Sequence, residues 1–206
     1  MQPDNPTPDP ELYLVGPTDN REIDRAIQIS LLGAEAVESP ATFLPEPEAD
    51  FKQEWDRWSN GLFRKTIIPE FVGVYTATRE MRHLEISRLD ASLDADIPSP
   101  PGKRSLAAAR IFLDRKADVR HMPQWVKFED RIAAGSSAGH LATLFAIQSA
   151  LFHVPVFPAL ISYAWLEWRA ADSGNKDFSD PVFQRIAGVI RTAAQPPEEE
   201  KFFRVV

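Results

Sequence analysis

Cysteine is absent from this chain of 206 residues. Its absence excludes disulfide bonds, zinc sites built from thiolates and catalysis by a cysteine nucleophile. It also fits the reducing environment of the cytoplasm, where we expect the protein to reside. The opening residues, MQPDNPTPDPELY, lack the basic stretch and the apolar stretch of a secretory signal, in agreement with that expectation.

Positive charge is scarce relative to negative charge. The 23 lysines and arginines face 30 aspartates and glutamates, which leaves a net charge of −7. Domains that bind nucleic acids normally carry a basic face, and anionic membranes attract basic surfaces. We therefore expect no nucleic-acid ligand and no membrane ligand. A hydrophobic content of 44% predicts an ordinary globular protein instead.

The alternation of apolar and polar residues that is typical of β-strands never extends beyond a few residues, and there is no internal repeat. Apolar residues recur instead at helical spacing, as Ile23, Ile27, Leu31 and Ala34 illustrate. The sequence therefore predicts an all-α fold, a single-domain helical bundle of seven or eight helices.

The 18 prolines divide the chain into predicted segments. We expect an extended or disordered arm over 1–20, an all-helical domain over 21–194 and a flexible tail over 195–206. Loops are expected over 39–50 and 97–103. Helices are predicted over 21–38, 51–63, 70–95, 105–116, 138–153, 157–171 and 181–194, with a further helix that starts at Pro123.

Charged side chains are nearly missing from residues 135–171, where only Glu167 and Arg169 occur. A membrane-spanning helix needs about 20 mainly apolar residues, and His153, Pro155 and Pro158 interrupt the stretch before that length is reached. We therefore predict a pair of buried helices joined by a short turn, and no membrane span.

Residues suited to metal binding are few. Glu80 and His83 have the Glu-x-x-His spacing of helical di-iron proteins, but no second copy of the motif exists. We interpret them as a polar pair on the surface of one helix. His140 and His153 are too far apart to share a metal on adjacent turns, and we expect them at the two ends of one helix. The sequence predicts neither a metal nor a cofactor.

The string GSSAG over 135–139 matches the nucleophile elbow of α/β-hydrolases, with Ser137 in the place of the nucleophile. That motif requires a preceding strand, and none is predicted there. Small residues at the start of a helix explain the string equally well. Because no phosphate-binding loop or dinucleotide fingerprint is present either, we predict that the protein is not an enzyme.

Two pairs of tryptophans occur at helical spacing, Trp55 with Trp58 and Trp165 with Trp168. Each pair places two large rings on one helix face, which is typical of a core or a subunit interface. A ligand pocket between helices is the alternative. The corresponding alternative function is a helical domain that binds a small molecule of unknown identity.

Five segments from Trp58 onward follow one another in a familiar order. They are WSNGL over 58–62, PGKRSLAAARIFL over 101–113, the glycine-then-histidine entry into a small-residue helix over 135–154, ISYAWLEWR over 161–169, and the glutamine-containing helix over 180–194. In this order the chain resembles the UreF family of urease accessory proteins. The resemblance covers about two thirds of the chain, and residues 1–50 have no counterpart in it.

The resemblance implies a non-catalytic, all-helical scaffold, often a homodimer. Such a scaffold binds a second accessory protein and then a GTPase that carries nickel toward apo-urease. The tail, PPEEEKFFRVV, is either a solvated acidic segment or a segment that docks on a partner. The predicted partner-binding residues are Arg104, Ser105, Arg110, Gln184, Arg185, Phe202 and Phe203.

Overall fold

The all-α class is confirmed. The computed structural model describes residues 20–46, 48–115, 119–171, 178 and 180–193, and within these ranges it contains helices and no strand. Its α-helices are α2 (Asn20–Ser30), α3 (Phe51–Trp58), α4 (Ile68–Arg79), α5 (His83–Asp96), α6 (Pro101–Arg115), α7 (Pro123–Ala133), α8 (Leu141–Leu151), α9 (Val156–Ala171), α10 (Pro181–Gln184) and α11 (Ile186–Ala193). A 3₁₀ turn (Ala34–Ala36) follows α2, and a π-helical segment (Ser59–Ile67) joins α3 to α4.

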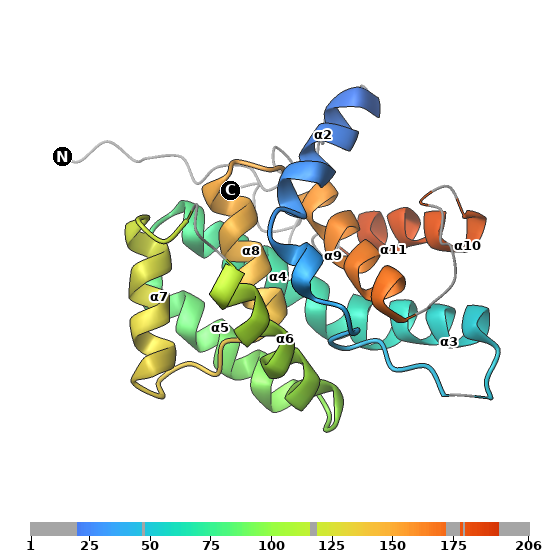
Figure 1. The fold of residues 1–206 in the computed structure, drawn as a ribbon, viewed down its shortest axis with the longest axis horizontal. Helices are drawn as coiled ribbons and strands as arrows, with labels where there is room; N and C mark the ends of the chain where they lie inside the picture. Colours follow the sequence, from blue (N-terminus) through green and yellow to red (C-terminus); the bar gives the residue numbers. More distant parts are fainter. Residues whose placement is uncertain (1–19, 47, 116–118, 172–177, 179, 194–206) are drawn as a thin grey trace, which may run out of the picture.

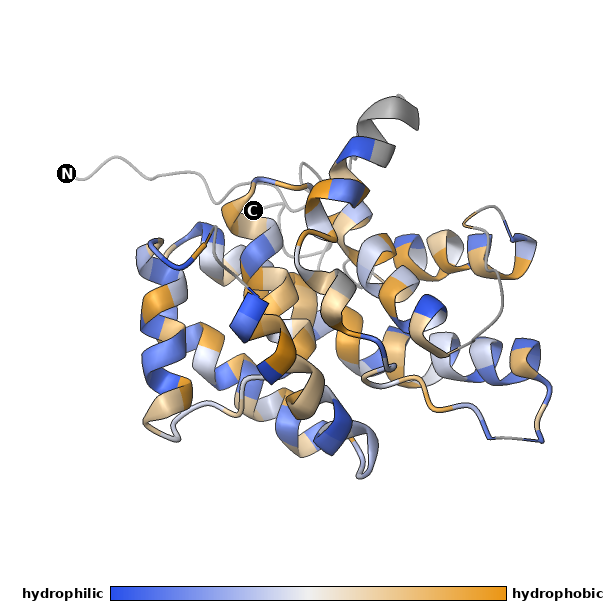
Figure 2. Cartoon of the chain, viewed as in Figure 1, coloured by the Kyte–Doolittle hydropathy of each residue, from blue (hydrophilic) through white to orange (hydrophobic). Residues whose placement is uncertain are grey.

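Helices α8 and α9 form the centre of the molecule. They separate α5, α6 and α7 on one side from α3, α10 and α11 on the other (Figure 1). Every residue from Leu141 to Ala150 in α8 is buried. Hydrophobic residues accordingly dominate these two helices, whereas the outer helices mix hydrophobic and hydrophilic residues (Figure 2). The predicted pair of buried helices over 138–153 and 157–171 is therefore confirmed.

Helix α4 runs parallel to α8 and packs along it. The rings of Phe71 and Phe145 lie 6.4 Å apart, and the Tyr75 hydroxyl donates a hydrogen bond of 2.9 Å to the Val154 carbonyl. The carboxyl ends of the two helices lie on the same side of the fold, where the side chains of Arg79 and His153 meet. This arrangement brings the α4–α5 corner next to the α8–α9 turn.

Several predicted boundaries were wrong. The helix over 21–38 ends at Ser30, because Gly33 takes a left-handed conformation with φ of 74° before the 3₁₀ turn. The helix over 51–63 continues into α4 through the π-helical segment, with a kink at Gly61. The last helix is divided into α10 and α11. The loop over 39–50 is confirmed in its described residues.

The long helix predicted over 70–95 is also wrong, because α4 ends at Arg79 and α5 begins at His83. At this corner the Arg82 N–H donates to the Ala77 carbonyl at 2.8 Å, and the Met81 N–H donates to the Thr78 carbonyl at 3.1 Å. These two bonds form the Schellman motif, which ends helices with a left-handed residue. Here that residue is Met81, with φ of 57°.

The predicted arm over 1–20, apart from Asn20, and the predicted tail over 195–206 lie outside the described residues. The described helices share one hydrophobic core, which extends from Ala26 to Ile190. Among the described helices, none has the length and apolar content that crossing a bilayer would need.

Candidate partner-binding site

The fully buried carboxylate of Glu167, on α9, has a structural role. Its two oxygens accept hydrogen bonds of 2.9–3.1 Å from the backbone N–H groups of Ala41, Thr42 and Phe43. They also accept from the hydroxyls of Thr42 at 2.7 Å and Tyr163 at 3.0 Å. Burial, and then the Glu167 charge, raise the pKa of the Tyr163 hydroxyl well above its usual value. Glu167 therefore fastens the loop after α2 to the core.

A second buried carboxylate, Asp90 on α5, caps α8 from a neighbouring helix. Its oxygens accept from the N–H groups of Gly139 at 2.8 Å and His140 at 3.1 Å, and from the Thr143 hydroxyl at 2.7 Å. A negative charge at this end of a helix also interacts favourably with the helix dipole. Both buried carboxylates are therefore saturated by structural hydrogen bonds.

The string GSSAG does not lie at a strand-to-helix turn. It follows α7 and leads into α8, as the sequence indicated. Gly139 has φ of 78°, and a β-carbon there would lie 2.6 Å from a methyl group of Ile132. Ser137 is buried, and its hydroxyl has no hydrogen-bond partner among the described residues. The segment therefore serves helix entry, without the geometry of a nucleophile elbow.

Glu80 and His83 do not form a pair on one helix surface, so this interpretation was wrong. Glu80 is the last-turn cap of α4 and forms an ion pair of 2.6 Å with Arg82, whereas His83 starts α5. His140 and His153 do lie at the two ends of α8, as predicted. Across the described residues, no three histidine or carboxylate side chains are grouped closely enough to hold a metal ion.

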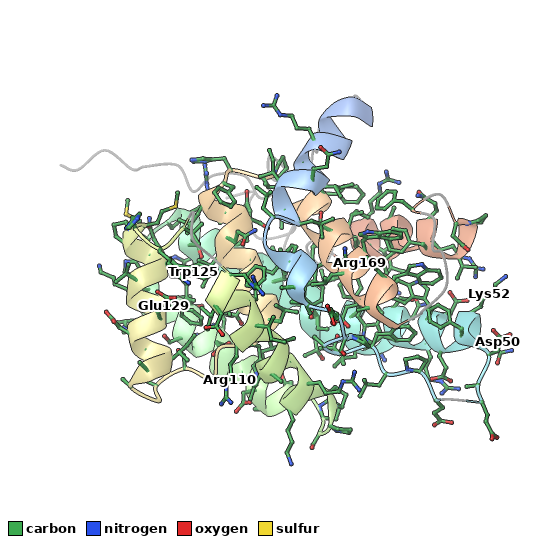
Figure 3. All side chains as sticks on the ribbon, in the orientation of Figure 1. Asp50, Lys52, Arg110, Trp125, Glu129 and Arg169 are labelled. Atoms are coloured by element: carbon green, nitrogen blue, oxygen red, sulfur yellow. The ribbon has the colours of Figure 1, made fainter. Side chains whose placement is uncertain are left out.

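The tryptophans pack against one another and against phenylalanines. The Trp55 ring centroid lies 4.8 Å from that of Trp58 and 4.7 Å from that of Trp168. Trp165 packs on the rings of Phe178 and Phe183 at 5.1–5.2 Å. Trp125, labelled in Figure 3, is fully buried on α7. The paired tryptophans therefore belong to an aromatic cluster of the core.

An open groove lies between the α4–α5 corner and α7, and we call it the corner groove. Its volume is about 1080 Å³. The lining side chains used below are Met81, Arg82, His83 and Leu84 from the corner, and Lys127 and Arg131 from α7. Met81 and Leu84 are 65% and 75% exposed, more than any other large apolar residue of the described chain. These two exposed apolar side chains form a hydrophobic surface along one edge of a groove that also contains charged side chains.

The backbone of Met81 is left-handed, although its side chain contributes little to the packing of the fold. Three helices end in the same Schellman motif, and the left-handed residue is Gly135 after α7, His153 after α8 and Met81 after α4. A side chain in this conformation costs about 1–2 kcal/mol relative to an ordinary backbone conformation. The His153 side chain contacts Arg79, whereas that of Met81 is largely in solvent. The fold gains little from a methionine at this corner.

The basic side chains of α7 are the part of the corner groove that suits an anionic group of a ligand. Lys127 Nζ lies 3.3 Å from His83 Nε2, and Arg131 donates to the Ser87 hydroxyl at 3.2 Å. Neither Lys127 nor Arg131 has a carboxylate within 4.0 Å in the described part of the chain. The carboxylates of Asp130 and Glu85 also line the groove, and Glu85 forms an ion pair of 2.6 Å with Arg88. Burial, and then the charges of Lys127 and Arg131, lower the pKa of His83.

The predicted partner-binding residues of α6 differ in their exposure. Ser105 is fully buried, and its hydroxyl accepts from the Leu141 N–H at 3.2 Å, so it offers no surface to a partner. Arg104 is exposed and donates to the Pro40 carbonyl at 3.2 Å. It lines a second cavity, of about 390 Å³, between α6 and the loop after the 3₁₀ turn. Arg110 is exposed on α6 (Figure 3).

Two predicted residues, Gln184 and Arg185, belong to the α10–α11 region, which lies across α8 and α9 from α7 (Figure 1). Gln184 is exposed and donates to the Phe178 carbonyl at 2.7 Å. Arg185 forms an ion pair of 2.9 Å with Asp56 of α3. Phe202 and Phe203 lie outside the described residues. The structure therefore does not bring the described members of the predicted set together into one surface.

Sequence reasoning missed Met81, Leu84 and Lys127 as site residues. No glycine, proline or asparagine marks the α4–α5 corner, so the segment REMRHLE fits an uninterrupted helix. The signal available in the sequence was the presence of two apolar residues, Met81 and Leu84, inside the charged segment REMRHLE. Comparison of the chain with family models, with curated proteins and with solved structures finds no match.

Proposed function

We propose that this chain is a non-catalytic helical scaffold that binds a partner protein at the corner groove. The observation that carries the proposal is Met81, an exposed apolar side chain held in a left-handed conformation that glycine would adopt at no steric cost. Backbone strain of this kind tends to occur at functional sites. Leu84, on the next turn, extends the apolar edge.

The buried polar groups support a non-catalytic role. The carboxylate oxygens of Glu167 and Asp90 already accept hydrogen bonds from backbone N–H groups and hydroxyls. They are therefore unsuited to proton transfer with a substrate. The corner groove combines exposed apolar side chains with two basic groups that have no carboxylate partner among the described residues, a composition that suits a protein segment with acidic and apolar residues.

The test is a quantitative affinity purification from the cells that produce the protein. Leu84→Ser removes an apolar side chain that is 75% exposed, so it should leave folding intact. Ile111→Ser is the matched control, because Ile111 is 44% exposed on α6, outside the corner groove. We expect a protein that wild type and Ile111→Ser retain and that Leu84→Ser loses at least about fivefold, or roughly 1 kcal/mol. Equal retention by all three would contradict the proposal.

The more specific form of the proposal is an accessory role in nickel-enzyme maturation, in which the partners are a second accessory protein, a GTPase and apo-urease. It is supported by the sequence resemblance to the UreF family over residues 58–194. The test is co-purification with those proteins in a reconstituted mixture. A chain that passes through the mixture unbound to any of them would contradict this form and leave the general proposal standing.

A further inference from the structure

The corner groove has a defined chemistry on its two sides. Lys127 and Arg131 supply positive charge without a carboxylate neighbour among the described residues, and Met81 and Leu84 supply apolar contact surface. A complementary ligand is an extended segment with acidic residues followed by large apolar ones. The charge and the apolar contact would then be satisfied by one short peptide.

The chain itself contains such a segment after α11. Residues 198–206 read EEEKFFRVV: three consecutive glutamates come first, Lys201 separates them from Phe202 and Phe203, and Arg204 follows. We propose that this segment of the same molecule binds in the corner groove, with its glutamates at Lys127 and Arg131 and a phenylalanine against Leu84. The proposal uses the same groove as the proposed function and assigns it a competing intramolecular ligand.

The course of the chain brings the end of α11 to the correct edge of the fold. The guanidinium of Arg191 lies 5.2 Å from the ring centroid of Phe157, which belongs to the first turn of α9. His153 precedes that turn and contacts Arg79, two residues before Met81. The contacts of Arg191, Phe157, His153 and Arg79 therefore form a continuous path from α11 to the groove.

The length of the segment sets how far from α11 it can bind. Phe202 is the ninth residue after Ala193, and an extended chain spans about 3.3 Å per residue, so Phe202 reaches roughly 30 Å from the end of α11. The path itself consists of close side-chain contacts and single turns of chain at the two corners. A ligand tethered this closely has an effective concentration in the millimolar range, which makes even a weak contact well populated.

Intramolecular docking would regulate access to the groove. A partner with the same acidic and apolar character would have to displace residues 198–206 before it could bind. The sequence predicts Phe202 and Phe203 as partner-binding residues. In this arrangement they would instead compete with the partner for the groove. If residues 198–206 were removed, the apparent affinity of the groove for the partner would rise by the inverse of the fraction of molecules in which the groove is free.

The lack of cysteine allows a direct test on the purified full chain, without any partner. The variant Leu84→Cys/Phe202→Cys carries the only two thiols, and mild oxidation should close an intramolecular disulfide if these residues meet. The control Ile111→Cys/Phe202→Cys places the first thiol at an exposed site on α6. We expect the Leu84 pair to close at least about tenfold faster, as a monomer.

A charge reversal separates specific docking from random encounter. Lys127→Glu, added to the Leu84 pair, should slow closure at least about threefold, whereas Lys103→Glu on exposed α6 should leave the rate unchanged. Equal closure of the Leu84 and Ile111 pairs, no effect of Lys127→Glu, or disulfides formed mainly between two molecules would each overturn the proposal. Because no partner is present, these outcomes do not depend on whether the proposed function is correct.

Discussion

Replacement of Glu167 should distinguish the loss of a carboxylate from the loss of a hydrogen-bond acceptor. In wild type, Oε2 accepts from three backbone N–H groups, and Oε1 accepts from the hydroxyls of Thr42 and Tyr163. Glutamine keeps an oxygen for the N–H groups, and its amide N–H₂ can donate to the two hydroxyls, which rotate to accept. Only the charge assistance of the bonds is lost.

Leucine has a similar volume but accepts no hydrogen bond. Glu167→Leu leaves the N–H groups of Ala41, Thr42 and Phe43 buried without partners, and each such group costs about 1–3 kcal/mol. Allowing for partial rearrangement of the loop, we expect the free energy of unfolding to fall by about 4 kcal/mol for leucine and about 1–2 kcal/mol for glutamine.

Urea unfolding of both variants, followed by circular dichroism and tryptophan fluorescence, measures this difference. Ser162→Ala is a suitable control. Ser162 lies on the same buried helix, and its hydroxyl only donates to the Pro158 carbonyl of the preceding turn. If leucine were tolerated as well as glutamine, the loop after α2 would not depend on the Glu167 acceptor, and the assignment of its role would be refuted.

Three further predictions concern other single residues. Met81→Gly should raise the free energy of unfolding by about 0.5–1 kcal/mol in urea titrations, because the relief of left-handed strain exceeds the extra entropy of glycine in the unfolded chain; a loss of stability would contradict this. Asp90→Ala should lower it by about 3 kcal/mol and increase amide hydrogen exchange in the first turn of α8, and unchanged exchange there would contradict the capping role. Burial raises the pKa of Glu70 above its usual value, so its folded form favours the proton and stability is lost as pH rises through that pKa. Glu70→Gln cannot ionise, and its unfolding midpoint relative to wild type should therefore rise between pH 4 and pH 7, whereas a difference that is constant with pH would refute the assignment.

The centre of the fold could be predicted from the sequence because its signal is local. The stretch around α8 and α9 is apolar on all sides and is interrupted at Pro155, which predicts two buried helices, and Pro158 lies in the first turn of α9. The positions of Glu167 and Asp90 could not be predicted. Apart from Tyr163, which is four residues from Glu167, their partners are 124–126 and 49–53 residues away in the chain, and only the assembled fold brings these groups together.

The corner groove could not be predicted from the sequence for a different reason. A helix normally ends where the sequence supplies a glycine, an asparagine or a proline, and the corner at Met81 has none of these nearby. The Schellman bonds and the packing of α5 against α7 stabilise the corner against the local preference. The corner groove exists only because that preference is overridden, so sequence patterns alone predicted a continuous helix across it.

In the proposed function, Met81 contributes to partner binding at the expense of stability. The most direct measurement is the retention of partner protein by Met81→Gly in the quantitative affinity purification, with Ile111→Ser as the control. We expect Met81→Gly to retain at least about threefold less partner than wild type although it unfolds at a higher urea concentration. Retention equal to that of wild type would contradict the claim.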